Sequence, residues 1–91
     1  MHIRDDRKAL LARTQRLLGQ IEAIREVIRE GRDEDCYDVL HRMTSARGAL
    51  DGLIQLFVEG HIREHVVNAD DAQARAEAGE ILIKAVRTFL T

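Results

Sequence analysis

The sequence has no proline, a single cysteine and no long apolar run. Without proline, and with most of its six glycines isolated or at the ends of periodic segments, the chain is expected to be helical. One cysteine excludes an internal disulfide framework and suits a reducing compartment. The N-terminal residues MHIRDDRKALL are charged where a signal peptide would have its apolar stretch. These absences predict a cytoplasmic protein with no membrane partner.

Length and charge limit the protein further. Its 91 residues, 45% of them hydrophobic, suffice for one domain with a modest core, so we expect a single domain over residues 1–91. The net charge is −2, yet residues 1–32 hold eight Lys/Arg against five Asp/Glu, and the remainder holds six against eleven. The basic first segment can contact phosphate. The alternative is a solvated helix face with internal ion pairs.

Three periodic segments predict an all-α fold. The first runs from about residue 4 to 30 and ends at Gly31. The second begins near Asp33, whose carboxylate can cap the following turn, and continues to about residue 67 without a strong breaker. The third covers about residues 71–90 and has an apolar face in its C-terminal half. We therefore expect a three-helix protomer with a long central helix.

The central segment carries a heptad seam, in which residues recur at alternating spacings of four and three. A seam of this length has too little of its own chain to cover it, so a second copy is the expected partner. In a two-fold antiparallel pairing, Cys36 of one copy faces His61 of the other, and small residues, Gly48 and Ala49, lie at the centre. The seam consists of Cys36, Leu40, Met43, Arg47, Leu50, Ile54, Phe57 and His61.

The ends of this seam predict a metal site between two subunits. Cys36 and His61 lie about 38 Å apart along one helix, so they cannot share an ion within one chain. Across the antiparallel dimer they become neighbours, and His65 projects one turn after His61. A thiolate with two imidazoles suits a divalent ion such as nickel, cobalt or zinc. The alternatives are a buried cysteine that packs as a small hydrophobe and an incidental pair of surface histidines.

Four stretches of the chain resemble one known family over nearly its whole length. They are LARTQRLLGQ at residues 11–20, Asp35-Cys36, SARGALDGL at residues 45–53, and EGHIREH at residues 59–65. In these the sequence resembles the CsoR/RcnR/FrmR-type bacterial repressors, which respond to copper, to nickel and cobalt, or to formaldehyde. The resemblance implies a three-helix protomer, a dimer formed by an antiparallel helix pair, and assembly into a tetramer.

The resemblance also implies which residues bind the effector. Cys36, His61 and His65 match the family's metal ligands, and copper sensors have a cysteine at the last of these positions. Histidine at position 65 therefore implies nickel or cobalt, with zinc possible. The nickel and cobalt sensors recruit an N-terminal histidine as well, for which His2 is the only candidate. Formaldehyde sensors use the equivalent of Cys36 as a nucleophile together with an N-terminal proline, which this chain lacks, and that reading stays as the alternative.

For DNA, the resemblance implies contacts through Arg13, Arg16 and Gln20 on the first helix and Arg47 on the second. Lys8 is a further candidate. Arginine suits phosphate because its planar fork binds two oxygens at once. The implied mechanism is an apo form that binds operator DNA and is released when metal binds, through a coupling of roughly 1–3 kcal/mol.

Two other classes of function would make different use of the same residues. A cysteine enzyme using Cys36 with a histidine base lacks an orienting third group and an oxyanion-binding loop, so we do not expect an enzyme. A helical oligomeric interaction module without DNA binding would oligomerise but show no salt-dependent binding to an operator.

Overall fold

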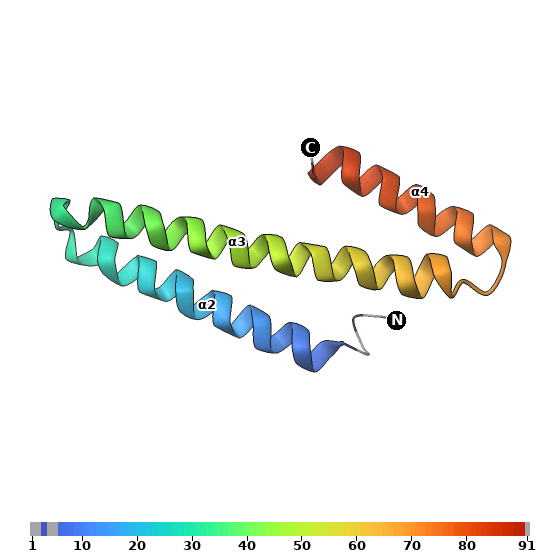
Figure 1. Ribbon diagram of the computed structural model, residues 1–91, viewed down its shortest axis with the longest axis horizontal. Helices are drawn as coiled ribbons and strands as arrows, with labels where there is room; N and C mark the ends of the chain where they lie inside the picture. Colours follow the sequence, from blue (N-terminus) through green and yellow to red (C-terminus); the bar gives the residue numbers. More distant parts are fainter. Residues whose placement is uncertain (1–2, 4–5, 91) are drawn as a thin grey trace. The chain divides into compact units, whose positions relative to one another are not determined.

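The computed structural model describes Ile3 and residues 6–90, and every element in that part of the chain is helical. In chain order they are α2 (Arg7–Glu30), the 3-10 helix η1 (Asp33–Asp35), α3 (Cys36–His61), the π-helix η2 (Ile62–Val67) and α4 (Ala72–Phe89). Figure 1 labels the three α-helices. The prediction of an all-α fold with three helices and a long central one is confirmed. Within the described residues, no helix combines the length and apolar character needed to cross a bilayer.

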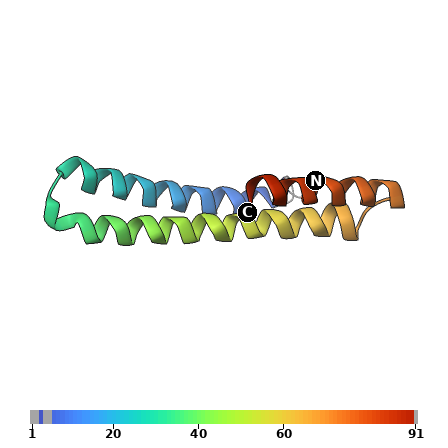
Figure 2. The same cartoon turned by 90° about the horizontal axis from the view of Figure 1, so that it is seen from above.

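Contacts divide the chain into two compact units. The hairpin unit (Arg7–Ile54) contains α2 and most of α3, which run side by side in opposite directions (Figure 1, Figure 2). The C-terminal unit, within the described residues, contains Gln55–Leu90 with Ile3 and Asp6, and thus the end of α3, η2 and α4. The prediction of a single domain over residues 1–91 stays a prediction.

The turn of the hairpin unit begins at Gly31, which has φ 69° and donates its N–H to the carbonyl of Val27. The expectation that the Asp33 carboxylate caps the next helix was wrong. Asp33 lies in the first turn of η1, and its backbone carbonyl accepts the N–H of Cys36. The reason is that α3 continues directly from a 3-10 turn, whose backbone bonds already engage the amide at the start of the helix.

Gly31 gives a direct test of this turn. Because a φ of 69° lies in the left-handed region, Gly31→Ala is expected to lower the free energy of unfolding by roughly 1–2 kcal/mol. Urea unfolding followed by circular dichroism measures this change. The matched control is Gly19→Ala, in the interior of α2 with open space around the new methyl group, which should instead stabilise the protein by about 1 kcal/mol. Equal stability of the two variants would contradict this account of the turn.

The core of the hairpin unit is small, as the composition predicted. Its buried side chains are Leu10, Ile24, Ala46 and Leu53. On α3, the buried positions 46 and 53 are seven residues apart and so lie on one face of the helix. The seam residues Leu40, Met43 and Leu50 of the same unit are exposed in the single chain, at 57%, 41% and 45%. This half of α3 thus has one apolar face that is covered and one that is not.

The small residues of α3 differ in how far their own chain covers them. Ala49 lines a notch together with residues of α2, and Ala46 is 5% exposed within the single chain. Ala46 is therefore covered within its own protomer, whereas Ala49 is exposed at the edge of this contact. Gly48 has open space around it. Gly48 and Ala49 are both exposed in the single chain, and their place at the centre of a helix pair stays a prediction.

In the C-terminal unit the long helix changes its winding at His61. The sequence predicts one helix to about residue 67, and the structure shows α3 followed by the π-helix η2, closed by a bond from the Asn68 N–H to the Arg63 carbonyl at 3.0 Å. After the turn, Asp71 caps α4 by accepting the N–H of Ala74 at 2.7 Å, which confirms the start predicted there. These bonds set the ends of the segment that carries both histidines.

Candidate metal centre and nucleic-acid interface

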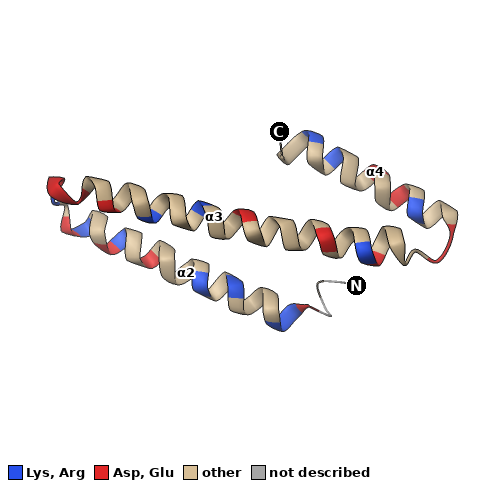
Figure 3. Ribbon diagram, in the orientation of Figure 1, with Lys and Arg blue, Asp and Glu red and all other residues tan. Residues whose placement is uncertain are grey.

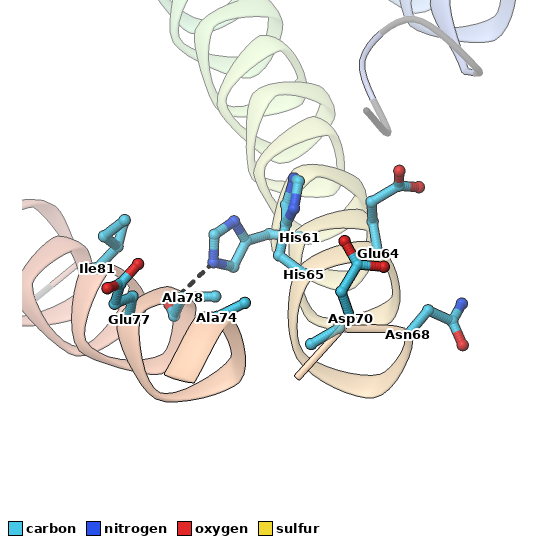
Figure 4. Close-up of a pocket in the computed structure, with 10 residues that line it drawn as sticks. His61, Glu64, His65, Asn68, Asp70, Ala74, Glu77, Ala78 and Ile81 are labelled. Atoms are coloured by element: carbon cyan, nitrogen blue, oxygen red, sulfur yellow. Dashed lines mark hydrogen bonds between the residues drawn. The ribbon is translucent and has the colours of Figure 1, made fainter. Parts of the chain in front are cut away.

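His61 and His65 lie next to each other at the end of α3, as predicted. His61 is the last residue of α3 and His65 lies in η2. Their ring centroids are 5.1 Å apart, with the ring planes inclined by 54°, and both side chains are half-buried (Figure 4). Two imidazoles at this separation can converge on one ion after small side-chain rotations.

The ring of His61 is held by α4. Its Nε2 lies 3.1 Å from the backbone carbonyl of Ala78 (Figure 4). A carbonyl can only accept, so Nε2 donates, and in the neutral ring Nδ1 is then the unprotonated nitrogen. Histidines that bind metal commonly donate their second ring N–H to such an acceptor, which fixes the tautomer and the ring orientation. This hydrogen bond therefore assigns the tautomer in which Nδ1 is the nitrogen that can bind a metal.

The two rings line a recess of about 620 Å³ within the C-terminal unit. Three carboxylates line the same recess, and their negative charge favours a cation there. Figure 4 shows these side chains around the two imidazoles. The full lining consists of His61, Glu64, His65, Asn68, Ala69, Asp70, Ala74, Glu77, Ala78 and Ile81.

Cys36 opens α3, while the two histidines follow at the other end of that helix. Its thiol is free and exposed. In the described part of one chain, no three His, Cys, Asp or Glu side chains are grouped closely enough to hold a metal ion. The predicted ligand His2 lies outside the described residues. One protomer therefore brings His61 and His65 together, and the site that Cys36 would complete between subunits stays a prediction.

The first half of α2 forms a basic face. Residues 7–20 hold four Lys/Arg and no Asp/Glu. Among the described residues, Lys8, Arg13 and Arg16 have no ion-pair partner. In the second half, Arg25 and Arg29 lie 4.0 and 3.2 Å from Glu22 and Glu26, and Figure 3 shows the signs alternating there. The ion pairs expected of a solvated face are thus present in the second half of the helix, and contact of the first half with phosphate stays a prediction.

The turn between α2 and α3 carries a separate ion-pair cluster. Arg32 lies 2.8 Å from Asp35 and 3.1 Å from Glu30, and these carboxylates raise its pKa above the ordinary value. The cluster neutralises Arg32 internally, so this arginine adds little to the positive potential of the hairpin unit.

Three of the predicted DNA-binding residues lie together. Arg13, Arg16 and Gln20 line one notch on the hairpin unit. Arg47 and Lys8 are exposed but do not line it. The structure therefore groups the α2 residues of the prediction and leaves the other two as separate surface positions.

Sequence comparison decides the family. Residues 6–88 match the family described as metal-sensitive transcriptional repressors. The chain belongs to this repressor family. A protein of this family represses transcription in response to metal and is a regulator rather than an enzyme, so the cysteine-enzyme alternative is rejected. Repression of transcription implies binding to operator DNA, which also disfavours an interaction module without a DNA partner.

Relatives cover almost the full length of the repressor. An uncharacterized protein of Serratia marcescens, described by its place in the bioA 5′ region, is 38% identical over 90 residues, covering 98% of this chain and 97% of its own. The transcriptional repressor RcnR of Salmonella paratyphi B is 30% identical over 89 residues, and RcnR of Citrobacter koseri is 29% identical, with the same shares of each chain covered. No solved structure shows significant similarity to the chain.

Some residues of the repressor's sites were missed by sequence reasoning. The carbonyl of Ala78 is a backbone atom, and no sequence signal marks it as a partner of His61. Leu17 and Ala49 line the same notch as Arg13, Arg16 and Gln20. From the sequence alone, a leucine or an alanine on a helix is expected to pack in the core rather than to line a binding site. The position of Ala49, three residues after the buried Ala46, is the one signal that could have placed it toward α2.

Proposed function

We propose that this repressor senses nickel or cobalt, with zinc as a further candidate, and acts in the cytoplasm as a homotetramer built from antiparallel helix-paired dimers. The apo form binds operator DNA, and metal binding releases it. The observation that carries the proposal is the adjacency of two imidazoles, 5.1 Å apart, in a recess lined by carboxylates. Nitrogen donors of this kind suit borderline divalent ions better than hard cations.

The proposed site is completed across the dimer. Cys36 of one subunit joins His61 and His65 of its partner, and His2 is proposed as an additional ligand. The exposed seam of the hairpin unit supports a helix-paired dimer, because an uncovered row of Leu40, Met43 and Leu50 favours burial against a second copy. In such a site the metal ion would supply a charge that holds groups from both subunits at fixed distances.

The site can communicate with the DNA face through the angle between helices. Because ligands of both protomers converge on one ion, metal binding selects one geometry of the helix pair. The hydrogen bond from His61 to Ala78 extends this constraint to α4. A coupling of roughly 1–3 kcal/mol, typical of allostery, suffices to weaken operator binding by about 5- to 150-fold.

The experiment is a gel shift with a duplex selected by the wild-type protein from a random-sequence pool. The apo protein should bind the selected duplex with strong salt dependence, and nickel or cobalt should release it. Release by formaldehyde without release by either metal would favour the formaldehyde-responsive alternative, in which the exposed thiol of Cys36 reacts. Oligomers that select no duplex at all would favour the interaction module and contradict the proposal.

A further inference from the structure

The arginines of the basic face enclose a notch between two helices. The notch lies within the hairpin unit, between α2 and the facing part of α3, and has a volume of about 260 Å³. Four of its lining residues come from α2, namely Arg13, Arg16, Leu17 and Gln20, and α3 contributes Ala49. A single methyl group is thus all that α3 places in the notch.

The size and lining of the notch define what it can hold. Pockets for whole small molecules usually measure roughly 300–1,000 Å³, so this smaller space suits a single chemical group. Two guanidinium groups and one amide supply hydrogen-bond donors, and no carboxylate of the described residues lines the notch. The occupant is therefore an anion, and the planar forks of two arginines fit the oxygens of a phosphate.

The guanidinium of Arg13 lies against α3, and no carboxylate of the described residues neutralises its charge. A methyl group added at Gly52 would lie 3.7 Å from Nη1 of Arg13, so the guanidinium rests against α3 at the glycine. Within the described residues, neither Arg13 nor Arg16 has an ion-pair partner. A guanidinium that is held in place loses less conformational entropy when it binds an anion.

We propose that the notch seats one phosphate of the DNA backbone, and that Ala49 is the positioning residue that keeps it open. This inference rests on the proposed function, since it names the part of the DNA that the basic face receives. Phosphates seated in a shaped site fix the register of a protein on the duplex, which a diffuse positive surface does not do. A larger side chain at position 49 would fill the space and leave every arginine in place.

The test is Ala49→Leu, measured by fluorescence anisotropy with the duplex that wild type selects. Because one charge-assisted contact is typically worth at least about tenfold in affinity, we expect a loss of that size or more. The slope of log K against log salt should become shallower by about 0.9 for each notch that engages DNA. Thr44→Leu, an exposed substitution on the same helix outside the notch, is the matched control and should leave both values unchanged.

Methylphosphonate substitution identifies the seated phosphate, because it removes the charge of one phosphate at a time. Wild type should show a discrete position where neutralisation weakens binding, and Ala49→Leu should lose sensitivity at that position and keep it elsewhere. An unchanged salt slope and an unchanged pattern of sensitive phosphates in Ala49→Leu would contradict the proposal that the notch binds a phosphate.

If Ala49→Leu loses the helicity or oligomeric state of wild type, Ala49→Met fills the same space with an unbranched side chain and gives the same readouts. If the wild-type protein selects no duplex, both the proposed function and the phosphate site in the notch are contradicted. If the wild-type protein binds a duplex and releases it with metal, the result for Ala49→Leu tests the phosphate site alone.

Discussion

Cys36→Ser is expected to remove the thiolate-to-nickel absorption band and to weaken nickel affinity by at least about 100-fold. The serine hydroxyl stays protonated near neutral pH, so the charged sulfur donor is lost while the size of the side chain barely changes. Losses of groups that only orient a ligand already cost 10- to 100-fold, and loss of a ligand should cost more. Titration with nickel, followed by absorption and by competition with a chelator, measures both effects.

The control for this variant is DNA binding without metal. Cys36 is the first residue of α3, and its side chain is exposed. The Cys36→Ser variant should therefore fold normally and, in the apo form, bind the selected duplex as tightly as wild type. It should then fail to leave the duplex when nickel is added. A nickel band of wild-type intensity in the variant would show that the sulfur is not a ligand.

The second large effect is expected from Arg13→Ala combined with Arg16→Ala. These side chains have no ion-pair partner among the described residues and lie in one notch, so their loss removes charge that is available to phosphate. We expect operator affinity to fall by about 100-fold or more and the salt dependence to become shallower. Nickel binding should be unaffected, because neither arginine is a metal ligand.

The matched control is Arg25→Ala combined with Arg29→Ala. It removes the same charge from the same helix, but these guanidinium groups lie beside Glu22 and Glu26. Since each pair is already close to neutral, we expect a small change in operator affinity. Equal losses of operator affinity in the two double variants would mean that DNA binding depends only on the net charge of α2. That result would contradict a specific basic face.

The main helices could be predicted from the sequence because their signals are local. Gly31 takes the left-handed conformation that ends α2, and Asp71 caps α4 through its own side chain. The π-helix after His61 could not be predicted, because a change in helical winding leaves no distinct hydrophobic pattern. The role of Asp33 was missed for a similar reason, since a carboxylate before a helix resembles a cap whether or not a 3-10 turn precedes the helix.

The candidate sites were predictable where spacing along one helix decides proximity. Histidines four residues apart lie together, and arginines on one face of α2 share a notch. Contacts between helices were harder. The bond from His61 to the Ala78 carbonyl and the place of Ala49 beside α2 depend on how the helices pack, and side-chain identity does not encode a backbone acceptor.

The seam residues lead to the central claim, that two subunits complete one metal site. The covered face of α3 holds Ala46 and Leu53, while Leu40, Met43 and Leu50 remain exposed in the single chain. An antiparallel pairing through these residues is what brings the thiol of one copy to the imidazoles of the other. Mixed oligomers can therefore show which chain supplies each ligand.

The most direct measurement mixes two inactive variants, Cys36→Ser and the double variant His61→Ala with His65→Ala. Each alone lacks one kind of ligand and should give no thiolate-to-nickel band. If the site lies between subunits, co-refolded mixtures regain one intact site in every mixed dimer, and about a quarter of the wild-type band returns after random exchange. If one chain supplied all the ligands, no mixture could rebuild a site. Mixed dimers without a band, once their formation is confirmed by mass spectrometry, would contradict the account.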